Sequence, residues 1–323
     1  MKKKIDILCT LGPSSLNKNF LKKIKNKVSL VRLNMSHLSL IKLEQNIKFI
    51  KKNSNIPICI DTEGAQIRTK IRKMRAFKTD QVGTIGRGLN FSLYPDYILK
   101  KIKKGHILDV GFDNLKIKII SVKSDKLLFR TLSPGRLENN KGVHLINGKI
   151  NLDYLTKKDF TAIKLARKYK IKNFALSFAN SSSDIKKFNK LLPRENKIFK
   201  IETLAAIKNL NSMIRLGKNF LIDRGDLSKE IGISKIPQAQ RYIINKINKK
   251  KGKKVLIATN YLESMIINSY PTRGEANDIF SAIEMGAGGL VLAAETAVGS
   301  YPVECVIFLE KMINESFKKF NIK

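Results

Sequence analysis

The chain has 323 residues, a formal net charge of +37 and a hydrophobic fraction of 43%. This length allows one large domain or two smaller ones with a sizeable core, and no apolar run approaches the roughly 18 residues that a membrane span needs. The three cysteines lie far apart in apolar segments, without metal-ligand spacing. This pattern is typical of reduced thiols in a cytoplasmic protein.

The excess of positive charge has two interpretations. One is a surface that binds nucleic acid, and the other is lysine spread over solvent-exposed faces. The lysines scatter along the chain and few aromatic residues lie among them. We therefore do not expect nucleic acid as a partner, although a positive field would attract anionic substrates such as phosphates.

Short apolar runs rich in β-branched residues recur along the chain, and amphipathic helical patterns follow most of them. The expected strands are 5–11, 30–35, 56–61, 173–178, 197–202, 220–223, 254–259 and 289–293. Continuous apolar runs of this kind indicate parallel strands buried on both faces. Eight alternating strand and helix units predict an α/β fold, specifically a (β/α)₈ TIM barrel.

The helical pattern is clear over 15–25, 38–50 and 238–247. A further helix is expected to begin with Ser183 or Asp184 as its N-cap and to end at Leu192, because Pro193 follows.

The segment between the third and fourth strands interrupts the alternation. Glycine and Asn/Asp residues separate β-type runs at 107–110, 115–122, 126–131 and 143–146, and a helical pattern resumes over 158–169. We therefore predict a barrel over 1–69 and 154–323, with a small β-barrel domain over 70–153 inserted after strand three. A domain inserted on that face of a barrel is placed to act as a lid over an active site.

Polar side chains follow six of the expected strands at their carboxyl ends. They are Arg32, Asn34, Ser36, His37, Asp61, Thr62, Arg68, Lys200, Glu202, Arg224, Gly225, Asp226, Thr259, Glu295 and Thr296. Any one of them is weak evidence, because an ordinary structural ion pair would explain Arg32, Glu202 or Asp226 singly. Convergence from six strands is harder to explain by packing, because functional groups in barrels gather on this face.

The residue types suggest phosphate chemistry assisted by a metal. Glu202 and Asp226 offer hard oxygen ligands for Mg²⁺, Lys200 offers a point charge for a phosphoryl group in transit, and Arg32 can grip a phosphate bidentately. Gly225 permits close backbone approach to an anion such as a carboxylate. An all-oxygen group suited to a monovalent cation is formed by Asn34, Ser36, Asp61 and Thr62.

Several segments resemble motifs of the pyruvate kinase family, in the same order and over nearly the whole chain. They are CTLGPSS (9–15), RLNMSH (32–37), DTEGAQIRT (61–69), NKGVHLING (140–148), KIET (200–203), RGDL (224–227), ATNYLESMI (258–266), YPTRGEANDIF (270–280) and ETAVGSYP (295–302). The resemblance implies a (β/α)₈ barrel with an inserted β-barrel lid. It also implies phosphoryl transfer between phosphoenolpyruvate and ADP, which yields pyruvate and ATP.

The resemblance also implies a role for each matching residue. Lys200 and Thr259 are the expected catalytic residues, the latter on the route of enolate protonation, and Arg32, Gly225, Asp226 and Thr259 bind substrate. Arg68 and Lys141 contact the nucleotide phosphates. The expected Mg²⁺ ligands are Glu202 and Asp226, and the expected K⁺ ligands are Asn34, Ser36, Asp61 and Thr62.

Some positions depart from the family pattern. Gln66 replaces a residue whose acidic form goes with potassium dependence, so the K⁺ requirement stays open, and Asp223 replaces a small residue, which leaves the substrate open. The usual C-terminal α/β domain, with its effector control, is expected to be absent. A homodimer through the barrel face near Thr272 and Arg273 is one expected assembly.

Three functional hypotheses follow. The leading one is a compact pyruvate kinase, or a relative with an altered enolpyruvate-type substrate. The second is a metal-dependent enolpyruvate lyase or aldolase, against which Arg68, Lys141 and the lid argue. The third is a non-catalytic binding protein on the same fold, against which the intact Lys200, Glu202 and Asp226 argue.

Overall fold

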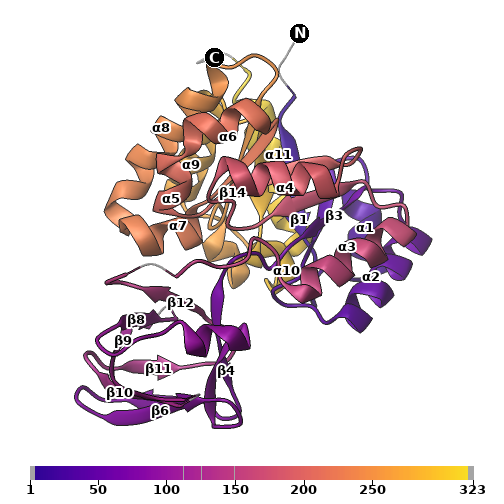
Figure 1. Cartoon of the computed structure of the whole chain (residues 1–323). Coiled ribbons are helices and arrows are strands. Elements are labelled where there is room, and N and C mark those ends of the chain that lie inside the picture. Colours follow the sequence, from indigo (N-terminus) through magenta and orange to yellow (C-terminus); the bar gives the residue numbers. More distant parts are fainter. Residues whose placement is uncertain (1–3, 112, 125, 149, 319–323) are drawn as a thin grey trace. The chain divides into compact units, whose positions relative to one another are not determined.

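The structure is a computed structural model that describes residues 4–111, 113–124, 126–148 and 150–318. The chain forms two compact units, drawn in Figure 1. The first comprises Met1–Gly64 and Lys157–Lys323, and the second is Ala65–Thr156. The second unit therefore begins before residue 70, the start assigned from the sequence.

The first unit is built on a closed barrel of eight parallel strands, as the sequence predicts. In barrel order the strands are β1 (Asp6–Thr10), β17 (Gly289–Leu292), β16 (Lys254–Ala258), β15 (Asn219–Asp223), β14 (Asn196–Ile201), β13 (Asn173–Leu176), β3 (Ile58–Asp61) and β2 (Leu30–Asn34). Each strand lies within one of the apolar runs identified above or extends it by one residue. These runs are continuous because both faces of every strand are buried: one faces the barrel interior and the other faces the helices.

Helices surround the barrel (Figure 1). They are α1 (Lys18–Ile24), α2 (Leu40–Asn53), α3 (Lys157–Lys168), α4 (Ser182–Leu191), α5 (Leu204–Lys208), α6 (Leu210–Leu216), α7 (Arg224–Ile231), α8 (Ile236–Asn248), α9 (Arg273–Glu284), α10 (Ala294–Ala297) and α11 (Pro302–Glu315). Short 3₁₀ turns form η2 (Ile233–Lys235) and η3 (Glu263–Ile266). Side-chain caps fix several helix starts; Thr272 and Glu275, for example, form a capping box at α9.

The start of α4 corrects the prediction. Ser181, and neither Ser183 nor Asp184, is the N-cap, and its hydroxyl accepts the Asp184 N–H at 3.3 Å. Asp184 lies in the first turn, where its carboxylate accepts the Asn180 N–H at 3.0 Å and the Ser181 hydroxyl at 2.9 Å. This exchange satisfies amides at the helix start that a later cap would leave unpaired.

The second unit is an antiparallel β structure with its own core. Its main sheet runs in the order β6 (Val82–Gly86), β10 (Lys126–Thr131), β9 (Leu115–Lys123), β8 (Ile107–Val110), β12 (Gly142–Leu145), β4 (Ile67–Ile71) and β7 (Phe91–Tyr94). The edge strands β6 and β7 also contact each other, so the sheet is barrel-like. A two-stranded ribbon, β5 (Arg75–Phe77) with β11 (Gly135–Leu137), and the 3₁₀ turn η1 (Asp96–Lys100) complete the unit.

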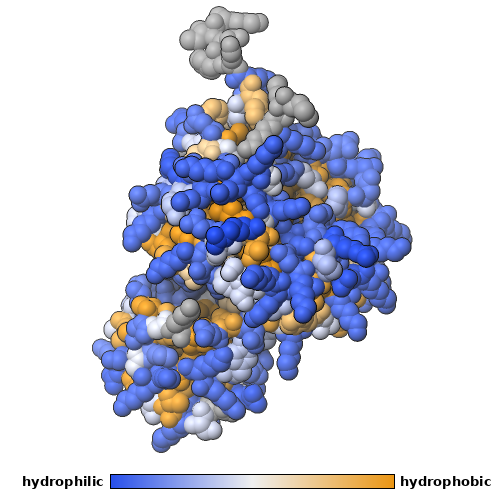
Figure 2. Space-filling view, turned by 45° about the horizontal axis from the view of Figure 1, so that its top comes forward, coloured by the Kyte–Doolittle hydropathy of each residue, from blue (hydrophilic) through white to orange (hydrophobic). Residues whose placement is uncertain are grey.

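Hydrophilic side chains dominate the face of the molecule in Figure 2, with smaller hydrophobic areas between them. Among the described residues, no helix combines the length and the apolar character needed to cross a membrane. The three cysteine side chains, Cys9, Cys59 and Cys305, are buried, and burial raises the pKa of each thiol.

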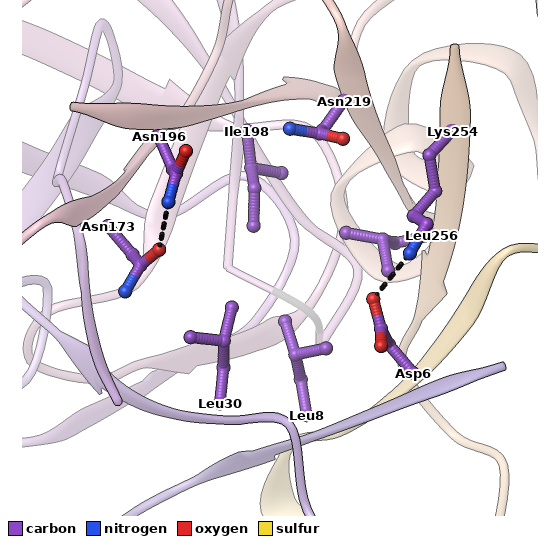
Figure 3. A pocket seen from close by; sticks show the side chains of 9 residues that line it. All are labelled: Asp6, Leu8, Leu30, Asn173, Asn196, Ile198, Asn219, Lys254 and Leu256. Carbon is purple, nitrogen blue, oxygen red and sulfur yellow. Dashed lines mark hydrogen bonds and ion pairs between the residues drawn. The ribbon is translucent and has the colours of Figure 1, made fainter. Parts of the chain in front are cut away.

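A cavity of about 160 Å³ opens at the amino ends of the barrel strands (Figure 3). Its polar side chains pair with one another: Asn196 Nδ2 donates to Asn173 Oδ1 at 3.0 Å, and Lys254 Nζ donates to Asp6 Oδ2 at 2.6 Å. The first pair joins the neighbouring strands β13 and β14, and the second joins β16 to β1 across β17. Because polar groups at this end of a barrel usually serve stability, we assign the cavity a structural role and look for chemistry at the opposite end.

Candidate active site

Lys200, at the carboxyl end of β14, is the centre of a buried ion cluster. Its Nζ lies 2.7 Å from Glu202 Oε1, 3.2 Å from Asp223 Oδ2 and 3.6 Å from Asp61 Oδ2. The side chain is only 6% exposed. Burial alone would lower the pKa of Lys200, but these three carboxylates outweigh it and raise the pKa above its usual range. The ammonium group is therefore a permanent positive charge in a site shielded from water.

Arg32, the middle residue of β2, supplies a second buried cation. Its Nη1 lies 3.1 Å from Asp61 Oδ2, and its Nε donates to Thr10 Oγ1 at 3.0 Å. Thr10 in turn donates to the carbonyl of Leu292 at 3.0 Å. The guanidinium group is thus held at the carboxyl end of the barrel by groups from β1 and β3.

Ser177 and Thr10 also belong to the cluster, and sequence reasoning missed both. The Ser177 hydroxyl donates to Asp61 Oδ1 at 3.1 Å and accepts from Lys200 Nζ at 3.3 Å. Both residues end or directly follow a barrel strand. The rule that identified Arg32 and Lys200 therefore applied to them too, but a single hydroxyl is too common to stand out in a sequence.

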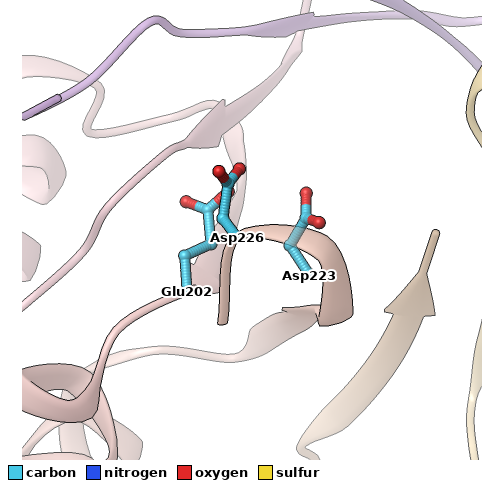
Figure 4. A group of neighbouring side chains, drawn as sticks. All are labelled: Glu202, Asp223 and Asp226. Carbon is cyan, nitrogen blue, oxygen red and sulfur yellow. The ribbon is translucent and has the colours of Figure 1, made fainter. Parts of the chain in front are cut away.

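Three carboxylates gather beside Lys200. Oxygens of Glu202, Asp223 and Asp226 all lie within 4.8 Å of one another, and Figure 4 shows their side chains together at the ends of β14 and β15. Burial, helped by its two acidic neighbours, raises the pKa of Glu202 to about 8 against the opposing effect of Lys200. Burial would also raise the pKa of Asp223, but Lys200 and Arg32 outweigh it and lower that pKa. Such a set of hard oxygens suits a small divalent cation.

Thr259 and Gly225 are brought together at the next strand end. The Gly225 N–H donates to Thr259 Oγ1 at 2.9 Å, and Thr259 has a left-handed backbone with φ of 77°. Arg224 fixes this corner: its Nη2 donates to the Thr259 carbonyl at 2.6 Å, its Nη1 pairs with Asp278 at 2.6 Å, and its guanidinium lies over the Tyr261 ring. A left-handed β-branched residue held so firmly is a feature of functional sites.

The four oxygen-bearing residues assigned to a monovalent cation occupy adjacent strand ends. Asn34 at the end of β2 is the register partner of Asp61 at the end of β3. Asn34 Oδ1 accepts the Ser36 N–H at 2.9 Å, and Thr62 Oγ1 accepts the Ser177 N–H at 3.1 Å. The structure therefore gathers Asn34, Ser36, Asp61 and Thr62 in one corner of the barrel.

Arg68 and Lys141 belong to the second unit, where β4 pairs with β12. Arg68 is the register partner of Gly142, and its Nη1 donates to the Asn140 carbonyl at 2.9 Å. Lys141 Nζ pairs with Glu138 at 3.0 Å. Arg68 and Lys141 thus lie close together in the backbone of one antiparallel pair.

Two further buried carboxylates serve the backbone. Glu295 accepts the N–H groups of Tyr261 at 3.0 Å, Leu262 at 3.3 Å and Ala293 at 2.7 Å. Asp159, which sequence reasoning did not single out, accepts those of Glu63 and Gly64 at 2.8 and 3.1 Å. Both stabilise loops that carry site residues, so we give them a structural role.

Comparison with known proteins identifies the family. Residues 2–306 match the family description "Pyruvate kinase, barrel domain". The chain belongs to the pyruvate kinase family. A pyruvate kinase from Thermotoga maritima is 32% identical over 97% of this chain, and one from Staphylococcus epidermidis is 32% identical over 94%. A crystal structure of a pyruvate kinase from Cryptosporidium parvum superposes with a TM-score of 0.84, at 27% identity and over 97% of this chain.

The chain spans part of the length of these pyruvate kinases. It covers 71% of the Thermotoga protein, 55% of the Staphylococcus protein and 69% of the Cryptosporidium chain. Membership in the pyruvate kinase family makes it a pyruvate kinase-like enzyme of the phosphotransferase class.

Proposed function

We propose that this phosphotransferase moves a phosphoryl group between phosphoenolpyruvate and ADP, giving pyruvate and ATP. The observation that carries the proposal is the buried cluster in which Lys200 meets Asp61, Glu202 and Asp223, with Arg32 on Asp61. Phosphoryl transfer needs little covalent chemistry from a protein. It needs cations fixed around a group whose negative charge is in transit, and Lys200 and Arg32 are such cations.

Mg²⁺ is the cofactor that the donor set fits. Glu202 and Asp226 would hold it, because carboxylate oxygens are preferred Mg²⁺ ligands and these lie within 4.8 Å of each other. The bound ion would neutralise charge on phosphate oxygens. Glu202 Oε1 is buried and lies 2.7 Å from the Lys200 ammonium.

The remaining roles follow from the positions of the side chains. The guanidinium N–H groups of Arg32 bind the phosphate of the substrate. The Lys200 ammonium stabilises the phosphoryl group while it is transferred. The amides at the start of α7, which include those of Gly225 and Asp226, bind the substrate carboxylate together with Thr259. The Thr259 hydroxyl, 2.9 Å from the Gly225 nitrogen, lies on the route by which the enolate receives a proton. In the second unit, Arg68 and Lys141 contact the nucleotide phosphates.

A coupled assay tests this function. We expect phosphoenolpyruvate, ADP and Mg²⁺ together to give pyruvate, measured by its reduction in the presence of lactate dehydrogenase and NADH. Omission of ADP is the decisive control, since pyruvate formed without nucleotide would indicate a lyase-type or phosphatase activity. An altered substrate would give a different result. The protein would then form no pyruvate from phosphoenolpyruvate and ADP, but would turn over another enol phosphate or 2-oxo-acid partner.

We expect K⁺ to change the rate of this reaction only modestly. The oxygens of Asn34, Ser36, Asp61 and Thr62 suit a monovalent cation, but Gln66 stands where the family has a charged residue linked to the K⁺ requirement. The measurement compares initial rates in K⁺ with rates at equal ionic strength in tetramethylammonium. A rise of roughly a hundredfold or more would show that Gln66 does not relieve the requirement.

A further inference from the structure

Arg224 is a site residue to which the proposed function gives no role. It directly follows β15 as the first residue of α7, at the end of the barrel where the site lies. Its side chain is only 13% exposed, and its guanidinium group is directed to the turn that follows β16. A cation so deeply buried is costly unless its donors are paired. The partners of Arg224 therefore indicate what it does.

All three nitrogens of the guanidinium group have partners. Nε and Nη2 both donate to the Thr259 carbonyl, at 3.1 and 2.6 Å, and Nη1 donates to Asp278 Oδ2 at 2.6 Å. The Tyr261 ring lies against the same group, with its centroid 4.3 Å from Cζ. Hydrogen bonds to a carbonyl and a carboxylate fix the plane of the guanidinium group, and the aromatic face attracts a cation that is shielded from water.

The backbone that Arg224 holds has an unfavourable conformation. Thr259 and Asn260 have φ values of 77° and 58°, and successive left-handed residues other than glycine are unusual. Such conformations persist only where surrounding contacts determine them. Arg224 holds the Thr259 carbonyl on one side of the turn, and Glu295 accepts the Tyr261 N–H at 3.0 Å on the other. Side chains that follow β15 and β17 thus determine the turn that follows β16.

This turn fixes the direction of the Thr259 hydroxyl. Because a β-branched residue has few favourable side-chain rotamers, the backbone conformation largely decides where its hydroxyl points. Thr259 Oγ1 accepts the Gly225 N–H at 2.9 Å and donates to the Ala258 carbonyl at 2.5 Å. In the proposed function this hydroxyl lies on the route by which a proton from water reaches the enolate carbon and gives pyruvate. That step needs a hydroxyl in the correct orientation.

We propose that Arg224 is a positioning residue for this proton transfer, because its hold on the Thr259 carbonyl sets the direction of the hydroxyl that serves the enolate. The inference rests on the proposed function. It goes further, because it divides the reaction between separate groups of residues. Lys200 and Arg32 act on phosphoryl transfer, whereas Arg224 acts through Thr259 on the protonation that follows.

Arg224→Lys separates the two steps. Lysine keeps the positive charge beside Asp278 but lacks the planar group that binds one carbonyl with two donors. With pyruvate, Mg²⁺ and ATP in D₂O, exchange of the pyruvate methyl protons, followed by ¹H NMR, should slow by roughly a hundredfold. ATP formed from phosphoenolpyruvate and ADP in a single turnover, measured by rapid quench, should slow by a much smaller factor. Equal losses in both rates would overturn the positioning role.

A second measurement does not depend on activity. The Gly225 amide is bonded to Thr259 Oγ1, so its hydrogen exchange reports whether the hydroxyl keeps its place. In Arg224→Lys this amide should exchange roughly tenfold faster, whereas the Leu227 amide of the same helix should keep its rate. Equal acceleration at both amides would indicate a general loosening of α7 and would contradict the proposal. Arg224→Gln, which lacks both the charge and the planar fork, provides the same test if the lysine variant does not fold.

Arg241→Lys is the matched control, since it makes the same substitution at an exposed arginine of α8. We expect both exchange rates to equal those of the unmodified chain, and losses as large as those of Arg224→Lys would overturn the proposal. The outcomes also separate the two levels of inference. If the unmodified chain forms no ATP and exchanges no pyruvate protons, the proposed function fails, while the Gly225 amide still decides whether Arg224 positions Thr259. If both reactions occur and Arg224→Lys slows neither, the positioning role fails and the proposed function stands.

Discussion

Lys200→Met should lower the turnover number for pyruvate formation by roughly a thousandfold or more, because a cation fixed at a transferring phosphoryl group contributes on that scale. On the sequence alone, methionine at this position would be expected to leave the fold intact. The ion cluster changes that expectation. The substitution leaves Asp61, Glu202 and Asp223 buried without the ammonium that lies within 3.6 Å of each. A loss of about 3–5 kcal/mol of stability is therefore expected as well.

Two further variants separate catalysis from stability at this position. Lys200→Arg keeps the charge and should retain most of the stability, yet its longer, planar group misplaces the charge and should still reduce turnover strongly. Lys197→Met is the matched control on the same strand, since its Nζ donates to the Leu192 carbonyl, at 2.5 Å, outside the ion cluster. Its turnover should stay within about twofold of normal. Unchanged turnover in a folded Lys200→Met protein would remove Lys200 from the reaction.

Gly64→Ala should strongly destabilise the barrel unit. Gly64 has φ of +69°, and an added Cβ would lie 2.4 Å from the backbone oxygen of Ser177. The left-handed conformation costs about 1–2 kcal/mol for alanine and the clash about 1–3 kcal/mol more. Turnover should fall too, because a shift of Ser177 moves a hydroxyl that contacts both Asp61 and Lys200.

Gly252→Ala is the control for this effect. Gly252 belongs to the same unit and has a similar φ of +73°, but nothing lies within 4 Å of the added Cβ. Gly252→Ala therefore has the free-energy cost of a left-handed alanine but no steric clash. Urea unfolding followed by circular dichroism gives the midpoint of each variant. Equal midpoints for the two variants would show that the backbone near Ser177 yields to the added methyl group.

The barrel was predictable because each of its strands is buried on both faces. Runs such as those around Phe220 and Val255 are continuous in hydrophobicity, and that pattern needs no knowledge of the partner strand. Some short strands of the second unit have no such signal. Arg75–Phe77 is a strand only because it pairs with Gly135–Leu137, about sixty residues later, and two of its three residues are exposed.

Most members of the candidate site were predictable from the sequence, but their contacts were not. Parallel strands bring their carboxyl ends to one face, so Arg32, Asp61, Lys200 and Glu202 were expected to be neighbours. Asp223 stood out from the sequence as an unusual carboxylate, but its contact with Lys200 depends on how β14 and β15 align. Contacts of this kind are set by register and side-chain direction, which composition and spacing do not contain.

The buried cysteines give the barrel unit an internal probe of its own opening. The chain has no tryptophan, so indole fluorescence cannot follow unfolding, but it has one thiol on β1, one on β3 and one on α11. Only a thiolate exposed to solvent reacts with an alkylating reagent, and burial suppresses both conditions. The labelling rate at Cys9, Cys59 or Cys305 consequently measures how often that part of the barrel opens. Mass spectrometry of the labelled peptides would thus map regional stability without any engineered reporter.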